Sequence, residues 1–342
     1  MMSATAEATN RDSVIEQHSI DSALHTERRW AEPRATSEVA PHVLAENDIP
    51  SLTPGMMKAI EEEELLQEWE RFLDVQTWAL GESEVAWLRS REFGTGRGVL
   101  EVGSAAGGYG AFLARNFSGT RIFGVESNPH LARRFRRSKA APPNYSIEVS
   151  KIGEDPIPKA VRGRFDRCVL RFVLQHVSDP ARVLRAVHDA LPVGGRIYVI
   201  EEDLSFLTTR PDWEPFQLTR DAWLRVTAAG GTDGVIGSKL PGLATEAGFT
   251  VDDLNIVLRN NVEMGTAFGD YLTSVIRLLQ KNSPDLVTEE EVRTVVDGFE
   301  ASRDDHAGHF VATYPQFLMM ATKVADRTHR HPRRPGHGVR VH

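Results

Sequence analysis

One stretch decides the fold: Val99-Leu100-Glu101-Val102-Gly103-Ser104-Ala105-Ala106-Gly107-Gly108-Tyr109-Gly110. An apolar strand runs through a carboxylate into small residues, and these residues open a helix. Small residues let the backbone approach a ligand closely, and the first N–H groups of a helix lack partners within the helix. The stretch therefore predicts a binding turn for a nucleotide-like ligand at the end of a strand.

The residues around the glycines narrow the choice of ligand. A phosphate loop carries a lysine after its last glycine, whereas Ala111-Phe112-Leu113 follows here, which excludes that reading. A dinucleotide fingerprint stays open, because Gly103, Ala105 and Gly108 nearly match its glycine pattern. Glu126 also lies where that fingerprint expects an acid for the ribose.

Glu101 favours a different ligand. A carboxylate just before the first glycine would repel a pyrophosphate and would attract a ligand that carries an amine and a sulfonium. S-adenosylmethionine (SAM) is such a ligand.

Composition limits the class of protein. With 342 residues, of which 41% are hydrophobic, the chain can bury a large α/β core. A net charge of −8 disfavours general binding to nucleic acid. The single cysteine, Cys168, excludes a disulfide framework and a cysteine-based zinc site. We see no export leader and no membrane-spanning run, and we expect a cytoplasmic protein.

Strand and helix patterns alternate through the middle of the chain. Apolar runs predict strands, and capping pairs such as Asn128-Pro129 and Asp179-Pro180 predict helix starts between them. Such alternation is typical of a parallel sheet with helices on both faces and a ligand at the carboxyl ends of the strands. The expected strands span residues 98–102, 121–125, 145–149, 165–170, 196–200, 253–258 and 317–324.

The chain divides into four segments by composition. We expect a flexible arm over residues 1–50, a helical lid over 51–92, a catalytic domain over 93–327 and a flexible tail over 328–342. The lid pattern predicts one helix around Leu65 to Leu73 and a separate short helix from Glu82 to Arg89. A helical insertion is expected at about 261–312, where Thr288 to Glu291 form a capping box.

Four segments together resemble the class I SAM-dependent methyltransferases, in particular the small-molecule branch related to ubiquinone and menaquinone biosynthesis. They are residues 99–107, 124–129, 165–180 and 191–197. The resemblance implies a Rossmann-like sheet of seven strands, mostly parallel, with an antiparallel last strand beside strand five. It also implies SAM as the cofactor and a small molecule as the methyl acceptor.

The resemblance also assigns residues to the cofactor. Glu126, with Ser127 beside it, would accept hydrogen bonds from both ribose hydroxyls, and Glu101 would lie near the amino group. Ala105 stands where the family usually has glycine, so its backbone must avoid positive φ or accept strain. The remaining expected contacts come from Gly103 and Gly107 in the turn, Ile152 and Gly153 at the adenine, and Arg171 and Phe172 after the fourth strand.

Catalytic candidates are few, because the sulfonium already activates the methyl group. His176 is a candidate base, and Glu202 and Asp203 follow the fifth strand. His306 and His309 show no carboxylate pattern of a known metal site, and we assign no metal. Aromatic residues could form an apolar acceptor pocket: Trp69, Phe72, Trp213, Phe216, Trp223 and Tyr271.

The sequence thus predicts a SAM-dependent methyltransferase acting on O, N or C of a small, partly apolar metabolite in specialised metabolism. Two alternatives stay open: a protein or RNA methyltransferase, and a SAM-binding protein that transfers no methyl group. The basic run over residues 133–137 is explained by one solvated helix face. A homodimer is open as well, because the N-terminal helices could pair two subunits.

Overall fold

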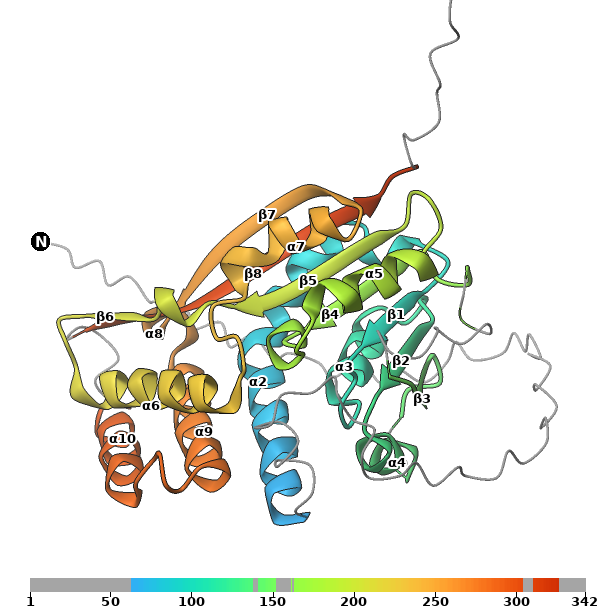
Figure 1. Ribbon diagram of the computed structural model, residues 1–342. Helices are drawn as coiled ribbons and strands as arrows, with labels where there is room; N and C mark the ends of the chain where they lie inside the picture. The colour runs from blue at the N-terminus through green and yellow to red at the C-terminus, as the bar shows by residue number, and fades with distance from the viewer. Residues whose placement is uncertain (1–62, 138–140, 152–160, 162, 304–309, 326–342) are drawn as a thin grey trace, which may run out of the picture. The chain divides into compact units, whose positions relative to one another are not determined.

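The computed structural model describes residues 63–137, 141–151, 161, 163–303 and 310–325. Their central element is an eight-stranded sheet in the order β3-β2-β1-β4-β5-β8-β6, with β7 also paired to β8 (Figure 1). The first five strands run parallel: β1 (Val99–Val102), β2 (Ile122–Glu126), β3 (Tyr145–Val149), β4 (Arg167–Arg171) and β5 (Arg196–Glu202).

The last strand, β8 (Val311–Lys323), lies antiparallel between β5 and β7 (Phe249–Asn260). The predicted Rossmann-like α/β sheet with an antiparallel strand beside strand five is confirmed. An eighth strand was not predicted: β6 (Thr208–Arg210) pairs with the start of β8. Three residues are too few to show a strand pattern in the sequence.

β7 and β8 are longer than predicted. The structure extends β8 through Pro315, a residue type that disfavours a strand, to Val311. In the structure Pro315 lies between the part of β8 paired with β6 and the part paired with β5. There β8 has a partner strand only on the β7 side, so a residue without an N–H is tolerated.

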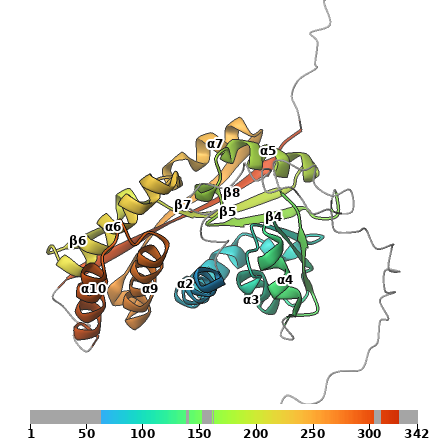
Figure 2. The same ribbon diagram turned by 60° about the horizontal axis from the view of Figure 1, so that its bottom comes forward.

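Helices cover both faces of the sheet, as predicted, and alternate residues of each strand enter different cores. Val99, Val169 and Tyr198 belong to one hydrophobic core, and Leu100 and Leu170 belong to the other. The first core includes residues of α3 (Gly108–Asn116) and α4 (Pro129–Arg137), and the second includes residues of α5 (Pro180–Ala190) and α7 (Leu240–Glu246). Figure 2 shows the helices on the two sides of the strands.

The lid prediction of two separate helices is wrong. A single helix, α2, runs from Glu63 to Ser90, and its 28 residues include Gly81. A Cβ on Gly81 would lie 2.8 Å from the ring of Phe112 in α3. This glycine therefore marks a close contact between two helices and not a break in one of them.

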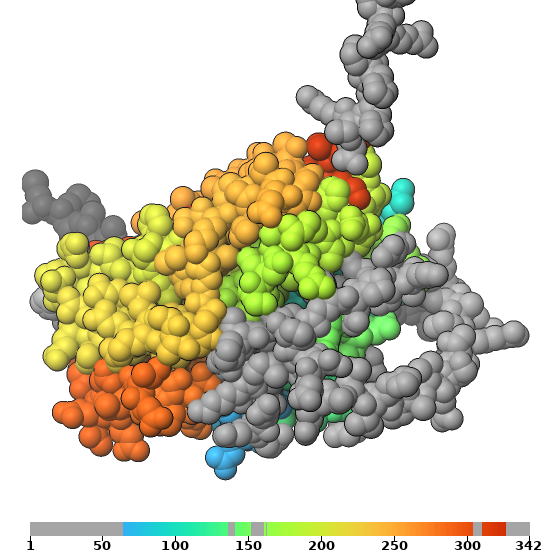
Figure 3. Space-filling model, in the orientation of Figure 1, coloured from blue at the N-terminus to red at the C-terminus, as the bar shows by residue number. Residues whose placement is uncertain are grey.

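Three further helices form a group beside the sheet. α9 (Thr266–Asn282) packs against α2, and α6 (Glu214–Gly230) and α10 (Glu289–Ala301) pack against α9 and against each other. α9 and α10 lie in the insertion between β7 and β8, where the four-residue α8 (Asn261–Met264) precedes them, whereas α6 comes before β7 in the chain. In Figure 3 the yellow surface of α6 lies against the orange surface of α9 and α10. Residues of α2, α6 and α9 lie near the carboxyl ends of the strands.

Candidate cofactor and acceptor site

A cavity of about 670 Å³ lies at the carboxyl ends of β1, β2, β4 and β5. One end is bordered by the glycine-rich turn, and the other end is bordered by α2, α6 and α9. Predicted residues that line it are Glu101, Gly103, Ala105, Gly107, Glu126, Ser127, Arg171, Phe172 and His176. Ile152 and Gly153 lie outside the described residues, as do His306 and His309.

The glycine-rich turn is shaped by residues with positive φ. Gly103 and Gly107 have φ of +73° and +80°. A Cβ on Gly107 would lie 2.4 Å from the ring of Phe135, so a larger side chain would have to displace α4. The turn therefore depends on glycine for conformation and for space.

Ala105 accepts the strain that its position imposes. Its φ is +47°, in the left-handed region that costs residues with a Cβ about 1–2 kcal/mol. Its backbone N–H donates a hydrogen bond of 2.7 Å to Glu126 Oε2, which holds the strained turn against the end of β2.

Ala105→Gly is expected to leave the free energy of unfolding unchanged or to raise it by up to about 1 kcal/mol. Relief of the positive φ outweighs or offsets the extra freedom of glycine in the unfolded chain. Ala106→Gly is the matched control, since Ala106 has no positive φ, and it should lower stability by about 0.5–1 kcal/mol. Thermal or urea unfolding measures both, and a loss at position 105 as large as at 106 contradicts the strain.

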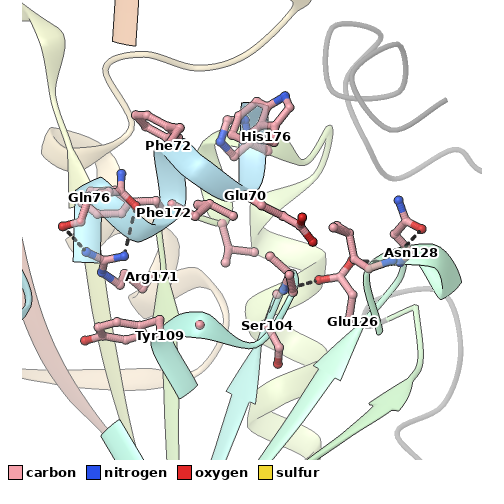
Figure 4. Close-up of a pocket in the computed structure, with 18 of the residues that line it drawn as sticks. Glu70, Phe72, Gln76, Ser104, Tyr109, Glu126, Asn128, Arg171, Phe172 and His176 are labelled. Atoms are coloured by element: carbon pink, nitrogen blue, oxygen red, sulfur yellow. Dashed lines mark hydrogen bonds between the residues drawn. The ribbon is translucent and has the colours of Figure 1, made fainter. Parts of the chain in front are cut away.

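Glu126 ends β2 and is 7% exposed. Its Oε1 accepts hydrogen bonds from Asn128 N at 2.8 Å and from Ser127 Oγ at 3.2 Å. Burial raises the pKa of Glu126, and the backbone donors Asn128 and Ala105 partly offset that rise. Figure 4 shows its carboxylate pointing toward the glycine-rich turn, where two paired oxygens suit a diol.

Glu101 provides a second buried carboxyl at the same end of the cavity. Its Oε2 accepts a hydrogen bond of 2.5 Å from the Tyr145 hydroxyl. Burial raises the pKa of Glu101 to about 7, with Glu126 adding to the rise and Tyr145 opposing it. Two buried acids beside small residues fit a cationic adenosyl ligand and disfavour a pyrophosphate.

Buried carboxyls make the stability of the protein without cofactor depend on pH. Burial raises the pKa of Glu101 and Glu202 to about 7 and that of Glu201 to about 8. Above about pH 6.5 the unfolded chain has already released these protons, whereas the folded protein still holds part of them. Stability therefore falls as pH rises through this window.

We expect the free energy of unfolding to fall by about 2–3 kcal/mol between about pH 6.5 and 8.5. We start the window at about pH 6.5 because of His176, whose pKa burial lowers to about 4. Below about pH 6.5 the unfolded chain holds a proton on this histidine that the folded protein lacks, so this residue makes stability rise with pH there. SAM should stabilise the protein more at the upper end, since its positive charge favours the ionised carboxyls. Urea unfolding with and without SAM measures this, and stability that is flat or rising would contradict it.

Arg171 lines the cavity, but its charge is already paired. Its Nε donates to Glu84 of α2 at 2.8 Å, and its Nη1 donates to Gln76 Oε1 at 3.0 Å. The guanidinium also lies 4.2 Å from the centre of the Tyr109 ring (Figure 4). Arg171 therefore fixes α2 to the end of β4, and its contact with a ligand carboxylate stays a prediction.

Phe172 follows Arg171 with φ of +52° and is 8% exposed. Its backbone N–H donates to Ile200 O at 2.8 Å, which keeps this turn in line with β5. The side chain thus borders the cavity while it also packs in the core, and its contact with the cofactor stays a prediction.

Of the two catalytic candidates His176 and Asp203, the structure places only His176 at the cavity. His176 borders the cavity, and its Nδ1 is buried with no hydrogen-bond partner among the described residues. Asp203 is fully buried, and its carboxylate accepts from Ser205 N and Ser238 N, each at 3.1 Å. The described residues that line the cavity do not include Asp203, whereas its neighbour Glu202 is among them. Asp203 therefore caps a turn.

The predicted aromatic pocket is present in part. Trp69, Phe72 and Trp223 line the cavity. Trp213 instead stacks on Phe310 with ring centres 4.2 Å apart. Phe216 and Tyr271 are buried in the core beside the cavity. The sequence analysis missed the aliphatic residues that complete the pocket, because apolar residues of an amphipathic helix do not show in the sequence whether they face a cavity or the core. They are Leu66, Val226, Val275, Leu278 and Leu279.

Two structural features are absent from the described ranges. No group of three histidine, cysteine or carboxylate side chains is placed to hold a metal ion there. Within the same ranges, no helix combines the length and apolar character needed to span a bilayer.

Comparisons with known proteins agree with this geometry. Residues 100–197 match the family model described as "Methyltransferase domain". The chain is 32% identical over 157 residues to an uncharacterized 37.1 kDa protein in transposon TN4556 of Streptomyces fradiae, covering 46% of this chain and 44% of that protein. It is 26% identical over 117 residues to a ubiquinone biosynthesis O-methyltransferase of Pseudomonas paraeruginosa, covering 34% of this chain and 48% of that protein.

A solved structure of geranyl diphosphate methyltransferase in complex with SAM matches with a TM-score of 0.44 and 15% identity, covering 80% of this chain and 97% of that one. The chain spans about half the length of the curated relatives it matches. Sheet order, binding turn and family match define a class I methyltransferase domain. Residues 100–197 form a methyltransferase domain that is distantly homologous to the ubiquinone biosynthesis O-methyltransferases.

Proposed function

We propose that the protein transfers the methyl group of SAM to a small, partly apolar acceptor. One observation carries the proposal: a single cavity joins the acidic, glycine-rich end to an aromatic and aliphatic end under α2, α6 and α9. A cationic cofactor suits the first end, and an apolar molecule suits the second.

The residues of the chain have separate tasks in this proposal. Glu126 binds the ribose hydroxyls, Glu101 holds the amino group, and the turn from Gly103 to Gly107 leaves room for the methionine part. SAM supplies the activated methyl group. The helices over the cavity exclude water and hold the acceptor in line, which is the main contribution such a reaction needs from a protein.

The test uses purified protein, methyl-labelled SAM and an extract of the cells that make the protein. We expect a labelled product of low molecular mass together with S-adenosylhomocysteine, and much less of both with Glu126→Ala at a SAM concentration below the dissociation constant of that variant. Label in the precipitated macromolecules would favour a protein or RNA acceptor. Conversion of an extract compound without S-adenosylhomocysteine would favour a role that transfers no methyl group. Either result would contradict the proposed function.

A further inference from the structure

Glu202 lies at the end of β5 and borders the cavity, although it is only 2% exposed. A series of donors stands behind it. The Tyr314 hydroxyl donates to Glu202 Oε2, and the Tyr271 hydroxyl donates to that of Tyr314 at 3.2 Å. Gln76 Nε2 of α2 donates to the Tyr271 hydroxyl at 3.4 Å. Every donor in the series points toward the carboxylate.

We propose that Glu202 is the general base of the methyl transfer and that the acceptor is an uncharged hydroxyl compound. Tyr314 is a positioning residue, which fixes one oxygen of Glu202 and leaves the carboxylate edge at the cavity to meet the acceptor. This inference rests on the proposed function and deepens it.

The other buried acids are committed elsewhere. Glu101 bonds to Tyr145 at the cofactor end. Glu201 Oε1 accepts from Val173 N at 2.8 Å and Leu174 N at 2.6 Å, and Glu201 is not among the described residues that line the cavity. Asp203 caps the following turn. Of the carboxyls at the end of β5, Glu202 alone borders the cavity within the described part of the chain.

His176 is a weaker base at this end of the cavity. Its ring packs against that of Trp69, with the two centres 6.1 Å apart. Burial lowers the pKa of His176 to about 4, so its affinity for a proton near neutral pH is small. A base is most effective when its pKa lies near the working pH.

The groups that face Glu202 set its protonation. Burial is the main cause that raises its pKa to about 7, and the neighbouring Asp203 adds to the rise. Hydrogen bonds from Tyr314 on β8 and Gln175 after β4, and the positive charge of Arg171, oppose it. Near neutral pH part of the carboxyl is therefore ionised and able to accept a proton.

The step balances with a hydroxyl acceptor and Glu202 as the base. The acceptor oxygen forms a bond to the methyl carbon, and the S–CH3 bond breaks with its electron pair left on sulfur. The acceptor O–H bond breaks with its pair kept by oxygen, and the proton passes to the Glu202 carboxylate. Charge is conserved, because one cation and one carboxylate become two neutral groups.

The walls of the acceptor end favour an uncharged molecule. Trp69, Phe72 and Trp223 present aromatic surface there, and Leu278 and Leu279 of α9 present aliphatic surface. An ionic acceptor would lose hydration against these side chains with little to replace it. A hydroxyl on an apolar body loses little hydration, and its proton can pass to Glu202.

The experiment compares Glu202→Gln, Tyr314→Phe and the exposed control Glu290→Gln with the unchanged protein. Initial rates of labelled-product formation are measured from methyl-labelled SAM and the cell extract across about pH 6 to 9. Glu202→Gln should lower the rate by about 100- to 10,000-fold. The rate of the unchanged protein should rise with pH near pH 7, as Glu202 ionises, and Glu202→Gln should abolish that rise. Glu202→Gln should leave the dissociation constant of S-adenosylhomocysteine within threefold. Glu290→Gln should match the unchanged protein.

Tyr314→Phe removes a donor to the carboxylate, so the rise of the rate should move to higher pH and the rate should recover there. A merely structural role of Tyr314 would lower the rate equally at every pH. The labelled product should be an O-methyl ether by mass fragmentation.

A Glu202→Gln variant that keeps the rate or the pH dependence would overturn the assignment, as would an N- or C-methylated product. If the unchanged protein forms no labelled product, the proposed function itself fails and the inference falls with it. That failure is distinct from an active enzyme that is insensitive at position 202.

Discussion

Glu84→Ala is expected to lower the free energy of unfolding by about 3–5 kcal/mol. Glu84 in α2 is fully buried and accepts hydrogen bonds from Arg171 Nε at 2.8 Å and from Gln316 Nε2 at 2.9 Å. Its removal leaves the buried guanidinium of Arg171 without its ionic partner, and that loss costs more than the pair contributes.

Glu82→Ala is the matched control, because Glu82 is an exposed residue of the same helix. It should change stability by less than about 0.5 kcal/mol. Urea unfolding of both variants decides the question. If Glu84→Ala costs no more than Glu82→Ala, then Arg171 does not fix α2 to the sheet.

Glu126→Ala is expected to raise the dissociation constant of SAM by about 100-fold, as calorimetry would measure. The change removes two charge-assisted contacts with the ribose and leaves the N–H groups of Ala105 and Asn128 without their acceptor. Glu126→Gln keeps one acceptor oxygen and should lose about tenfold.

Glu148→Gln on the adjacent strand β3 is the control, since Glu148 is not among the described residues that line the cavity. The affinity of the Glu148→Gln variant for SAM should match that of the unchanged protein. An affinity of Glu126→Ala within threefold of the unchanged protein would place the ribose elsewhere.

Local signals made much of this fold predictable from the sequence. Asp179 accepts from Arg182 N as the predicted cap, and Thr288 and Glu291 form the predicted capping box. The parallel strands match their predicted ranges to within about two residues at either end, because each is a short apolar run between turns. The binding turn could also be predicted from a local signal, because its residues are contiguous in the sequence.

Features set by contacts between distant segments were not predictable. Gly81 looks like a helix break until Phe112 is seen beside it. Arg171 looks available until Glu84, 87 residues earlier in the chain, is seen as its partner. Likewise, Glu202 and Asp203 are adjacent carboxylates that the sequence does not distinguish. Only the structure at the end of β5 shows that Glu202 borders the cavity and Asp203 does not.

The central claim is that the cavity beside Glu101 and Glu126 binds a cationic adenosyl sulfonium and not a pyrophosphate coenzyme. Titration calorimetry of the protein with SAM, S-adenosylhomocysteine and NAD tests it most directly. We predict saturable heat with SAM and with S-adenosylhomocysteine, and none with NAD. Saturable binding of NAD, with no heat from SAM or its demethylated product, would contradict it.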